Sequence, residues 1–403
     1  MQITQTKKGV FSYFRGMLLL FVGTHFAHHL VANLVNPLLP FIREEFSLTN
    51  TQVGWLTSAF TLTYGLAQFP GGWLADRLGS RFVIMMAVSG LALTGVFIGI
   101  APSYYLIVLS LILMGILGGG YHPAAAPLVS ATVEPWNMGT ALGIHQIGGS
   151  ASPMVAPLIA AAIAGVSGWR ASFLWLSAPT LIFGLFAYFV MGKSQGPAVM
   201  TKKGKGVSRE SSAPKSSISS ISAFIALSVV GQGVIHGAMT FVPLFIVSRY
   251  GKSKEIAAVW LSISRVGGIF AGPIGGYLSD RIGKIRVVLA ISIVAGPVIY
   301  LMSRVPYGVP LAAMLIMADM TQFIRMPVSE SYIISQVPEK NRSSVLGIYY
   351  LASRGAPGLA APMVGALLDR YSYPVSFGIA GGVLLVASLL SSLFLLRKGT
   401  VIA

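Results

Sequence analysis

The sequence predicts an all-α membrane protein with twelve transmembrane helices in two six-helix bundles. Three observations support this fold class. Hydrophobic residues make up 54% of the 403 residues and charged residues only 10%, against about 25% charged residues in a typical soluble domain. Apolar runs of about 20 residues, the helix length that crosses a bilayer, follow one another along the chain. A Gly-rich, charged turn also occurs twice, half a chain length apart.

Each apolar run is long enough to cross a hydrocarbon core about 30 Å thick as a helix. The expected spans are residues 16–41, 52–74, 82–101, 104–132, 139–165, 171–192, 221–248, 256–278, 286–303, 308–336, 343–367 and 373–396. The first run follows Lys7 and Lys8, as the apolar region of a signal peptide would. It continues to Phe41 without a plausible cleavage site, so we interpret it as the first spanning helix.

The longest break between apolar runs is rich in Gly, Ser and Lys, a composition typical of a flexible, solvated connector. We therefore expect an N-terminal six-helix bundle over residues 1–192, a cytoplasmic linker over 193–220 and a C-terminal six-helix bundle over 221–403.

The chain is strongly basic, with a net charge of +17 and an isoelectric point near 10.1. The basic residues lie in short loops between apolar runs, where membrane orientation explains them better than nucleic-acid binding does. They are concentrated in the loops on the side of Lys7, which include the long connector and the tail at Arg397. We expect both termini to be cytoplasmic and the protein to be a multi-pass protein of the cytoplasmic (inner) membrane.

The chain contains no cysteine, which excludes disulfides, a thiolate nucleophile and Cys-based metal sites. No nucleophile–base pairing or metal set is evident in the sequence either. We therefore expect that the protein is not an enzyme and needs no cofactor.

The repeated turn reads GGWLADRLGSR at residues 71–81 and GGYLSDRIGK at residues 275–284. Gly276 lies 204 residues after Gly72. The further matches at this offset are Pro123 with Pro327, Val133 with Val337, Gly143 with Gly347 and Pro153 with Pro357. Because six spans separate the copies, both have the same orientation in the membrane. The chain is therefore predicted to be a parallel repeat.

With these motifs, the chain resembles transporters of the major facilitator superfamily over its whole length. The turn after the second span matches the signature of that superfamily between helices two and three, and its copy lies between helices eight and nine. The resemblance implies two six-helix bundles around a central cavity that opens alternately to each side, lined by helices 1, 4, 7 and 10. Shorter motifs resemble fosmidomycin-resistance-type exporters: His28-His29, GGYHP at 119–123 and QIGG at 146–149.

The resemblance also implies that Asp76 and Asp280 act in the cytoplasmic gate and not in substrate binding. A carboxylate near the positive N-terminal end of a helix of the other half would be released when the halves tilt. The glycines of the motif allow tight turning and close helix approach. The predicted gating residues are Gly72, Asp76, Arg77, Gly79, Arg81, Gly276, Asp280, Arg281 and Gly283.

Charged residues deep in the membrane are candidates for function, because each costs about 2.5–3.5 kcal/mol or more at the bilayer centre. Arg265 precedes Asp280 by about 22 Å of helix, and Arg354 on helix eleven also falls near mid-depth. Two guanidinium groups can hold a carboxylate or phosphonate by bidentate hydrogen bonds, and deep cations on these helices resemble those of oxalate and monocarboxylate carriers. The alternative is that each Arg pairs with Asp319 or Glu330 and locks helices together.

Asp319 and Glu330 share one face of helix ten. Burial favours the neutral carboxyl group and a nearby Arg favours the charged one, a balance suited to proton coupling. We therefore predict proton coupling through Asp319 or Glu330. The alternative for Asp319 is a permanently ionised partner of an Arg, and Glu330 is also a candidate for the gate.

The histidines form a polar face on helix one, where His25, His28 and His29 lie with Asn33. Neutral imidazoles there can bind a substrate, take up a proton or simply bond neighbouring helices. Besides Arg265 and Arg354, the predicted substrate-binding residues are His25, His29, Asn33, His122, Gln232 and His236. His25 and His29 stand one helical turn apart, as in a zinc site, but no nearby carboxylate completes the ligand set, so we expect no metal.

The sequence thus predicts a secondary active transporter that moves a small organic anion by alternating access, coupled to protons or working by exchange. The alternative is a drug–proton antiporter that exports amphiphilic compounds, and the repeat of six spans argues against a channel. The expected partners are the small-molecule substrate and the lipid bilayer, without nucleic acid, and we expect a monomer.

Overall fold

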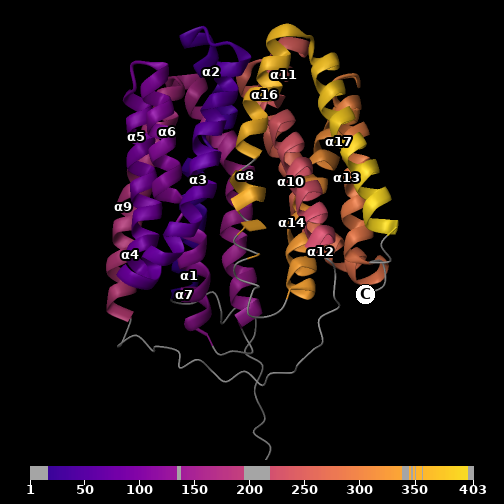
Figure 1. The fold of residues 1–403 in the computed structure, drawn as a ribbon. Helices are drawn as coiled ribbons and strands as arrows, with labels where there is room; N and C mark the ends of the chain where they lie inside the picture. Colours follow the sequence, from indigo (N-terminus) through magenta and orange to yellow (C-terminus); the bar gives the residue numbers. More distant parts are fainter. Residues whose placement is uncertain are drawn as a thin grey trace, which may run out of the picture.

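The computed structural model describes residues 17–133, 138–194, 218–337, 345, 348–349, 351–355 and 357–397. These residues form helices that run side by side, and no strand occurs in the described ranges (Figure 1). The first half contains α1 (Met17–Ala32), α2 (Val35–Phe46), α3 (Asn50–Leu78), α4 (Ser80–Met85), the π-helical turn η2 (Met86–Gly90), α5 (Leu91–Ile100), α6 (Tyr104–Gly118), α7 (Tyr121–Ala131), α8 (Met138–Ser167) and α9 (Trp169–Ser194). The second half contains α10 (Ile218–Thr240), α11 (Val242–Tyr250), α12 (Lys254–Ile282), α13 (Lys284–Met302), α14 (Val309–Gln336), the π-helical turn η4 (Leu351–Gly355), α16 (Pro357–Arg370) and α17 (Tyr373–Arg397).

The predicted all-α membrane fold is confirmed. Within the described ranges, 10 helical segments are long and apolar enough to cross a membrane. The other two expected spans correspond to α3, which is 29 residues long, and to the segment of η4 and α16. Part of the second segment lies outside the described residues, and both segments lie where the two halves of the chain meet.

Besides the spans that contain the π-helical turns η2 and η4, three of the expected spans are divided into two helices in the described ranges. The divisions fall between α1 and α2, between α6 and α7, and between α10 and α11. Each second helix has a proline in its first turn, namely Pro37, Pro123 and Pro243. Proline lacks the N–H that would continue the hydrogen-bond ladder and disfavours helical geometry in the residue before it, so it starts a helix better than it continues one.

The largest buried cluster, which includes Phe173 and Phe241, contains residues of both halves, and each half has a smaller cluster of its own. One buried cluster, which includes Phe21, Tyr121 and Met191, contains residues of the first half. A second cluster, which includes Phe224 and Tyr332, contains residues of the second half. Residues 195–217, most of the predicted linker, lie outside the described residues. We propose the division 1–192, 193–220 and 221–403 as the domain organisation.

The two copies of the repeated turn adopt the same conformation. Gly79 has φ 89° and ψ 140°, and Gly283 has φ 91° and ψ 143°, a backbone geometry that glycine adopts without steric cost. Shortly before each glycine, a guanidinium group stacks on an aromatic ring: Arg77 lies 4.3 Å from the ring of Trp73 and Arg281 lies 4.6 Å from that of Tyr277. The offset of 204 residues is therefore visible in the structure as well as in the sequence.

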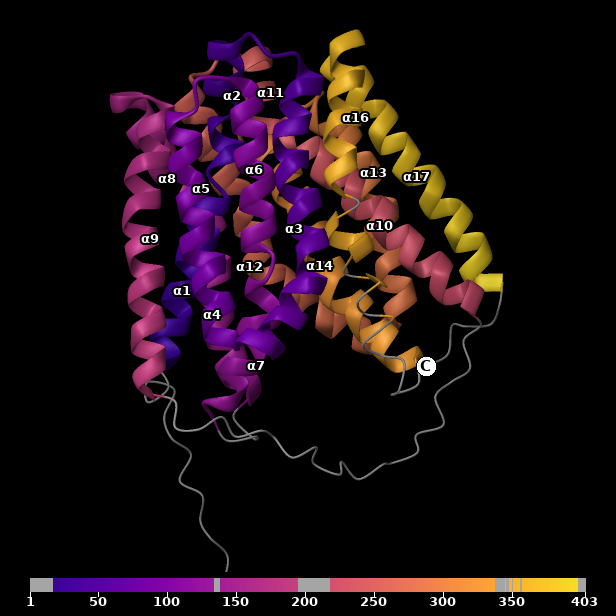
Figure 2. The same ribbon diagram turned by 60° about the vertical axis from the view of Figure 1, so that its left-hand side comes forward.

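The two ends of the helix bundle differ in how the halves meet. We call the end where α1 begins and α17 ends the terminal face, and the opposite end the far face; Figure 2 shows the terminal face at the bottom. Toward the far face, α3 of the first half runs against α16 of the second. A Cβ atom on Gly54 would lie 2.5 Å from the Cα atom of Pro362, and one on Gly358 would lie 2.7 Å from the Leu62 side chain. The hydroxyl of Ser58 donates to the carbonyl of Gly358.

At the far face, the carboxylate of Asp369 on α16 caps the N-terminus of α3. It accepts hydrogen bonds from the backbone N–H groups of Asn50 (2.7 Å) and Thr51 (3.0 Å) and from the Thr51 hydroxyl (2.6 Å). The hydroxyl of Thr49 accepts the next N–H, that of Gln52. The first free donors of α3 are thus satisfied by both halves together. Burial raises the pKa of the Asp369 carboxyl, but the hydrogen bonds from Thr51 and Asn50 outweigh that effect and hold its pKa below the usual range.

Further charged contacts surround this cap. Lys254 of the second half forms an ion pair with Glu44 of the first. Glu45, by contrast, binds within its own half, where it accepts hydrogen bonds from Arg170 (2.5 Å) and Trp169 (2.7 Å). At the terminal face, Asp76 and Asp280 are exposed. The halves are therefore joined at the far face, whereas Asp76 and Asp280, the carboxylates predicted to act in the gate, are exposed.

We expect the substitution Asp369→Asn to loosen the far face, because the amide cannot accept all three hydrogen bonds and carries no charge. The contact is largely exposed, so its loss should cost about 1 kcal/mol. This corresponds to a change of about fivefold in the ratio of molecules whose halves are joined at the far face to molecules in which they are separated. Since the chain has no cysteine, Ser58→Cys would place a single thiol at this closed contact. We predict that a maleimide alkylates that thiol about fivefold faster when Asp369→Asn is also present.

The matched control is Glu45→Gln, which breaks a contact within one half and should leave the alkylation rate of the Ser58→Cys thiol unchanged. Equal rates with and without the Asp369→Asn substitution would contradict the prediction.

Candidate functional site

A polar cavity of about 180 Å³ lies between the two halves. The first half contributes Thr61 and Tyr64 of α3. The second half contributes Ser228, Gln232 and His236 of α10, Met326 of α14, Tyr349, Ser353 of η4 and Pro357 of α16. Hydroxyl, amide and imidazole groups thus outnumber apolar side chains in its wall. The composition suits a small polar ligand better than a large apolar one.

Two of the residues predicted to bind substrate, Gln232 and His236, lie in this cavity wall. They stand one turn apart on α10 and both are partly buried. The Nε2 atom of His236 is buried and has no hydrogen-bond partner among the described residues. The predicted site residue Arg354 belongs to η4, beside Ser353, but its side chain lies outside the described part of the structure.

Arg265 forms an ion pair with Asp319 that joins α12 to α14. The Nη1 atom of Arg265 lies 3.0 Å from Oδ1 and 3.4 Å from Oδ2 of the carboxylate. Asp319 is completely buried, whereas the side chain of Arg265 is 19% exposed. The pairing that the sequence left open as an alternative is therefore present. It engages one nitrogen of the guanidinium group. Arg265 is not among the residues that line the polar cavity.

Sequence reasoning gave little weight to Arg325, which has the largest fully buried side chain of the described residues. Its Nη1 atom donates to the hydroxyl of Ser292 at 2.7 Å, while Nε and Nη2 have no hydrogen-bond partner in the described part of the chain. The guanidinium group packs against Gly231 of α10, next to the cavity residue Gln232. No carboxylate among the described residues lies within ion-pair distance of Arg325. The signal in the sequence that could have pointed to Arg325 was the occurrence of an arginine inside a predicted span.

Glu330, the second residue predicted for proton coupling, lies one turn further along α14 than Met326 of the cavity wall. It is partly buried and lies close enough to Tyr349 to interact with it electrostatically. Ser329, beside it, shares a hydrogen bond of 3.1 Å with Ser228 of α10. Glu330 is therefore near the cavity, whereas Asp319 is part of the ion pair deeper in the second half.

Five of the six histidines of the chain meet in the first half, on the side of Tyr64. The imidazole ring of His25 lies 4.9 Å from that of His29, 5.3 Å from that of His122 and 4.3 Å from that of His145. His28 stacks on Tyr121 at 4.5 Å. The rings come from α1, α7 and α8, so residues far apart in the sequence form one cluster.

Different members of this cluster have different hydrogen-bond partners. His28 is completely buried, and its two nitrogens contact the carbonyl of Ala87 (3.1 Å) and the hydroxyl of Tyr64 (3.2 Å). Nδ1 of His25 contacts the carbonyl of His145 (3.0 Å), while its Nε2 has no partner among the described residues. The side-chain amide of Asn33 donates to the carbonyl of His29 at the end of α1 (2.7 Å). Asn33, predicted to bind substrate, thus closes the last turn of its own helix.

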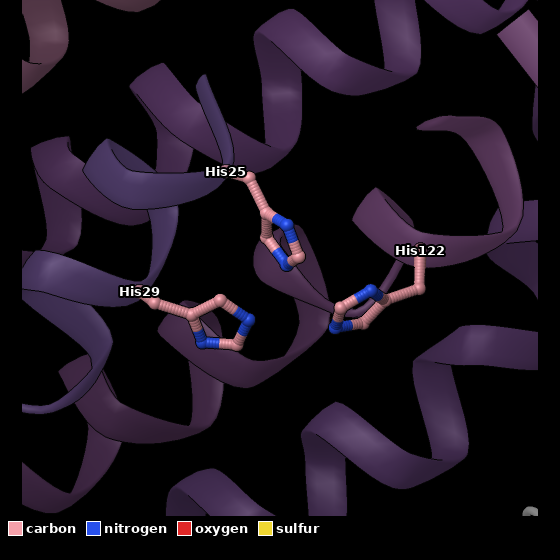
Figure 3. Close-up of side chains that lie close together, drawn as sticks. All are labelled: His25, His29 and His122. Carbon is pink, nitrogen blue, oxygen red and sulfur yellow. The ribbon is translucent and has the colours of Figure 1, made fainter. Parts of the chain in front are cut away.

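Figure 3 shows that three of these rings, those of His25, His29 and His122, point toward one another. One ring nitrogen from each lies within 4.8 Å of the other two, as in a site that could hold a metal ion. The sequence suggested the first two of these residues as a pair but gave no sign that His122 would join them.

A second cavity, lined almost entirely by apolar side chains, lies between α1, α8 and α9. Its volume is about 630 Å³ and its wall includes Leu19, Phe26, Ile147 and Phe183. Such a surface suits an acyl chain or another apolar group.

Comparison with known proteins places this geometry in context. The sequence matches the Major Facilitator Superfamily over residues 21–324 and 260–402. The probable sulfoacetate transporter SauU of Cupriavidus necator is 26% identical over 88% of this chain and 87% of its own length. The multidrug resistance protein MdtG of Klebsiella pneumoniae is 24% identical over 91% of this chain and 90% of its own.

Solved structures support the same fold. A bacterial homologue of the human lysosomal transporter Spinster, in an inward-facing and occupied conformation, matches with a TM-score of 0.77 and 17% identity over 98% of both chains. The nucleoside transporter NupG matches with a TM-score of 0.74 and 15% identity over 94% of this chain and 98% of its own. At these identities the likeness shows the fold alone. The match to the sequence family covers nearly the whole chain, and the chain therefore belongs to the Major Facilitator Superfamily of membrane transporters.

Proposed function

We propose that the protein is a secondary transporter that moves a small organic anion through the cavity between its two halves. The substrate-contacting residues in this proposal are Arg265, Arg354, His25, His29, Asn33, His122, Gln232 and His236. The observation that carries the proposal is the positive charge in the membrane-embedded part of the second half. Arg265 has a single carboxylate partner there, and Arg325 has none among the described residues.

The cost of burying charge explains why these arginines point to an anion. A fully buried guanidinium group without a counter-ion is unfavourable by about several kcal/mol in a low-dielectric interior. Arg325 lies against Gly231, next to Gln232 of the cavity wall, so its positive charge acts on the cavity. An anion that enters the cavity would supply the missing negative charge, and the partly exposed side chain of Arg265 would offer it hydrogen bonds.

One relative supports a small acidic cargo. It is described as a probable sulfoacetate transporter, and sulfoacetate carries a carboxylate and a sulfonate on a two-carbon frame. The cavity of about 180 Å³ is of a size that suits so small a molecule. We infer that the cargo is a short carboxylate, sulfonate or phosphonate.

The Arg265–Asp319 pair suggests how anion binding is coupled to protons. An anion that pairs with Arg265 would compete with Asp319 for the same guanidinium group. Asp319 would then be a completely buried carboxylate without its counter-ion, a state that proton uptake relieves. Binding of the anion and of the proton would favour each other, as symport requires. Glu330 is the second candidate for this proton.

The difference between the two ends of the helix bundle suggests how access to the cavity alternates. We propose that the terminal face, with both chain ends, is cytoplasmic and that the protein is a monomer in the inner membrane. The contacts of Asp369, Ser58 and Lys254 then close the outer side, and the exposed Asp76 and Asp280 belong to an open cytoplasmic gate. The glycines and arginines of both turns would close that gate when the far face separates.

A second candidate function is the export of amphiphilic drugs. Two observations favour it: the likeness to multidrug resistance proteins and the apolar cavity between α1, α8 and α9. Competition distinguishes the two candidates, because an anion transporter binds short acids and a drug exporter binds amphiphilic cations or neutral compounds. Purified protein titrated with both classes would show which class binds.

We predict that Arg265→Gln weakens the binding of short organic anions such as sulfoacetate about 10- to 100-fold. This factor corresponds to the loss of a charge-assisted hydrogen bond worth about 1.5–3 kcal/mol. Isothermal titration calorimetry in detergent measures it. Because Arg265→Gln leaves Asp319 unpaired, the double variant Arg265→Gln/Asp319→Asn is the control for folding. Unchanged anion affinity in the folded double variant would show that Arg265 is purely structural.

We predict that Asp319→Asn abolishes the acceleration of uptake by an inward proton gradient, because the amide takes up no proton. Exchange of labelled for unlabelled anion across the membrane, which needs no net proton movement, should persist. Proteoliposomes with and without a pH gradient provide the measurement. Equal stimulation by the gradient in Asp319→Asn and in the natural chain would rule out Asp319 as the coupling group, and Glu330→Gln would then be tested in the same assay.

A further inference from the structure

We propose that His25, His29 and His122 form a binding site for a divalent transition-metal ion beside the central cavity. One ring nitrogen from each residue lies within 4.8 Å of the other two, and the three rings converge in Figure 3. Sequence reasoning expected no metal because the ligand set was incomplete. The fold supplies a third ligand from α7.

The position of His122 follows from the packing of α7 on α3. The Cα atom of Gly120, at the break before α7, would lie 2.5 Å from a Cβ atom on Gly71 of α3. The two backbones are therefore in direct contact, which glycine alone permits. The contact fixes the first turn of α7, where His122 lies, against α3. His25 and His29 lie one turn apart on α1, so both rings can point to the same side.

The hydrogen bonds of His25 prepare it as a metal ligand. Its Nδ1 lies 3.0 Å from the carbonyl oxygen of His145. A carbonyl only accepts, so Nδ1 carries the hydrogen and Nε2 carries the lone pair. Metal-binding histidines commonly use their second nitrogen in this way. Nε2 is buried and has no other partner among the described residues, and a bound ion would satisfy it.

To bind a metal ion, the three ring nitrogens would need to move only slightly closer together. In a tetrahedral zinc site with Zn–N distances of about 2.0–2.1 Å, the nitrogens lie about 3.4 Å apart. The present limit of 4.8 Å is thus larger by about 1.4 Å at most. His29 and His122 are partly exposed, so rotation of their side chains can close this distance. His28 is excluded as a ligand because both of its nitrogens already have partners.

The ligand set selects the type of ion. Three neutral imidazoles suit Zn²⁺, Co²⁺, Ni²⁺ or Cu²⁺, whereas Mg²⁺ and Ca²⁺ prefer oxygen ligands. Three ligands leave a further coordination position open. The ring of His122 lies 6.4 Å from that of Tyr64, which lines the central cavity. The open position is therefore close to the cavity, where a water molecule or an acidic group could occupy it.

The test uses the full-length protein in detergent or nanodiscs, purified without a polyhistidine tag. We expect Zn²⁺ binding by calorimetry, and binding of Co²⁺ with the intense visible absorption of a four-coordinate ion. Substitution of residues that support metal ligands typically weakens metal binding roughly 10- to 100-fold. His29→Gln and His122→Gln each remove a ligand itself, so each should weaken Zn²⁺ binding by more than that. Affinity should also fall on acidification, because protons compete for the imidazole nitrogens.

The control is His236→Gln, which removes the histidine of the other half and should leave Zn²⁺ affinity unchanged. Thermal unfolding without metal shows whether each variant is folded, and Zn²⁺ should raise the melting temperature of the natural chain and of His236→Gln but not of the other two. The proposal is overturned if His29→Gln/His122→Gln, folded, binds Zn²⁺ as tightly as the natural chain, or if bound Co²⁺ has the weak spectrum of the six-coordinate aqueous ion. Failure of anion transport would not affect these readouts.

Discussion

The contact of α3 with α16 is the constraint on which the rest of the structure depends. The two segments pack against each other where the two halves meet. Backbone lies against backbone at Gly54 and Pro362, and Asp369 completes the hydrogen bonds of the α3 N-terminus. Because α3 and α16 also carry Thr61 and Pro357 of the cavity wall, their contact positions the two walls relative to each other.

The halves place different chemistry around that cavity. The first half gathers polar rings, five histidines with Tyr64 and Tyr121, and several of their hydrogen bonds are made within that half. The second half carries fixed charge, with the Arg265–Asp319 pair and the buried Arg325. Lipid provides no partner for polar groups, so each half must satisfy them within its own helices or at the shared cavity. In the proposed function, the charged second half would select the charge of the substrate, and the polar rings of the first half would contribute hydrogen bonds to it.

Duplication produced a symmetric scaffold with an asymmetric site. Gly79 and Gly283 keep the same backbone conformation, since the turn geometry leaves no room for change. Elsewhere the equivalent positions have diverged: Tyr121 corresponds to Arg325, and Thr61 to Arg265, at the offset of 204 residues. The two copies therefore share the turn glycines but differ at membrane-embedded positions that carry the charged groups of the second half.

The sequence by itself determined the twelve spans, the parallel repeat and the pairing of Arg265 with an acid as an open alternative, because hydropathy and a repeated motif are local properties. It did not reveal that α1, α7 and α8 bring His25, His122 and His145 together, or that Arg325 is buried without a carboxylate among the described residues. Those facts depend on which helices are neighbours and how they are rotated. Helix rotation in a bilayer is set by small-residue contacts such as that of Gly71 with Gly120, which only the packed structure shows.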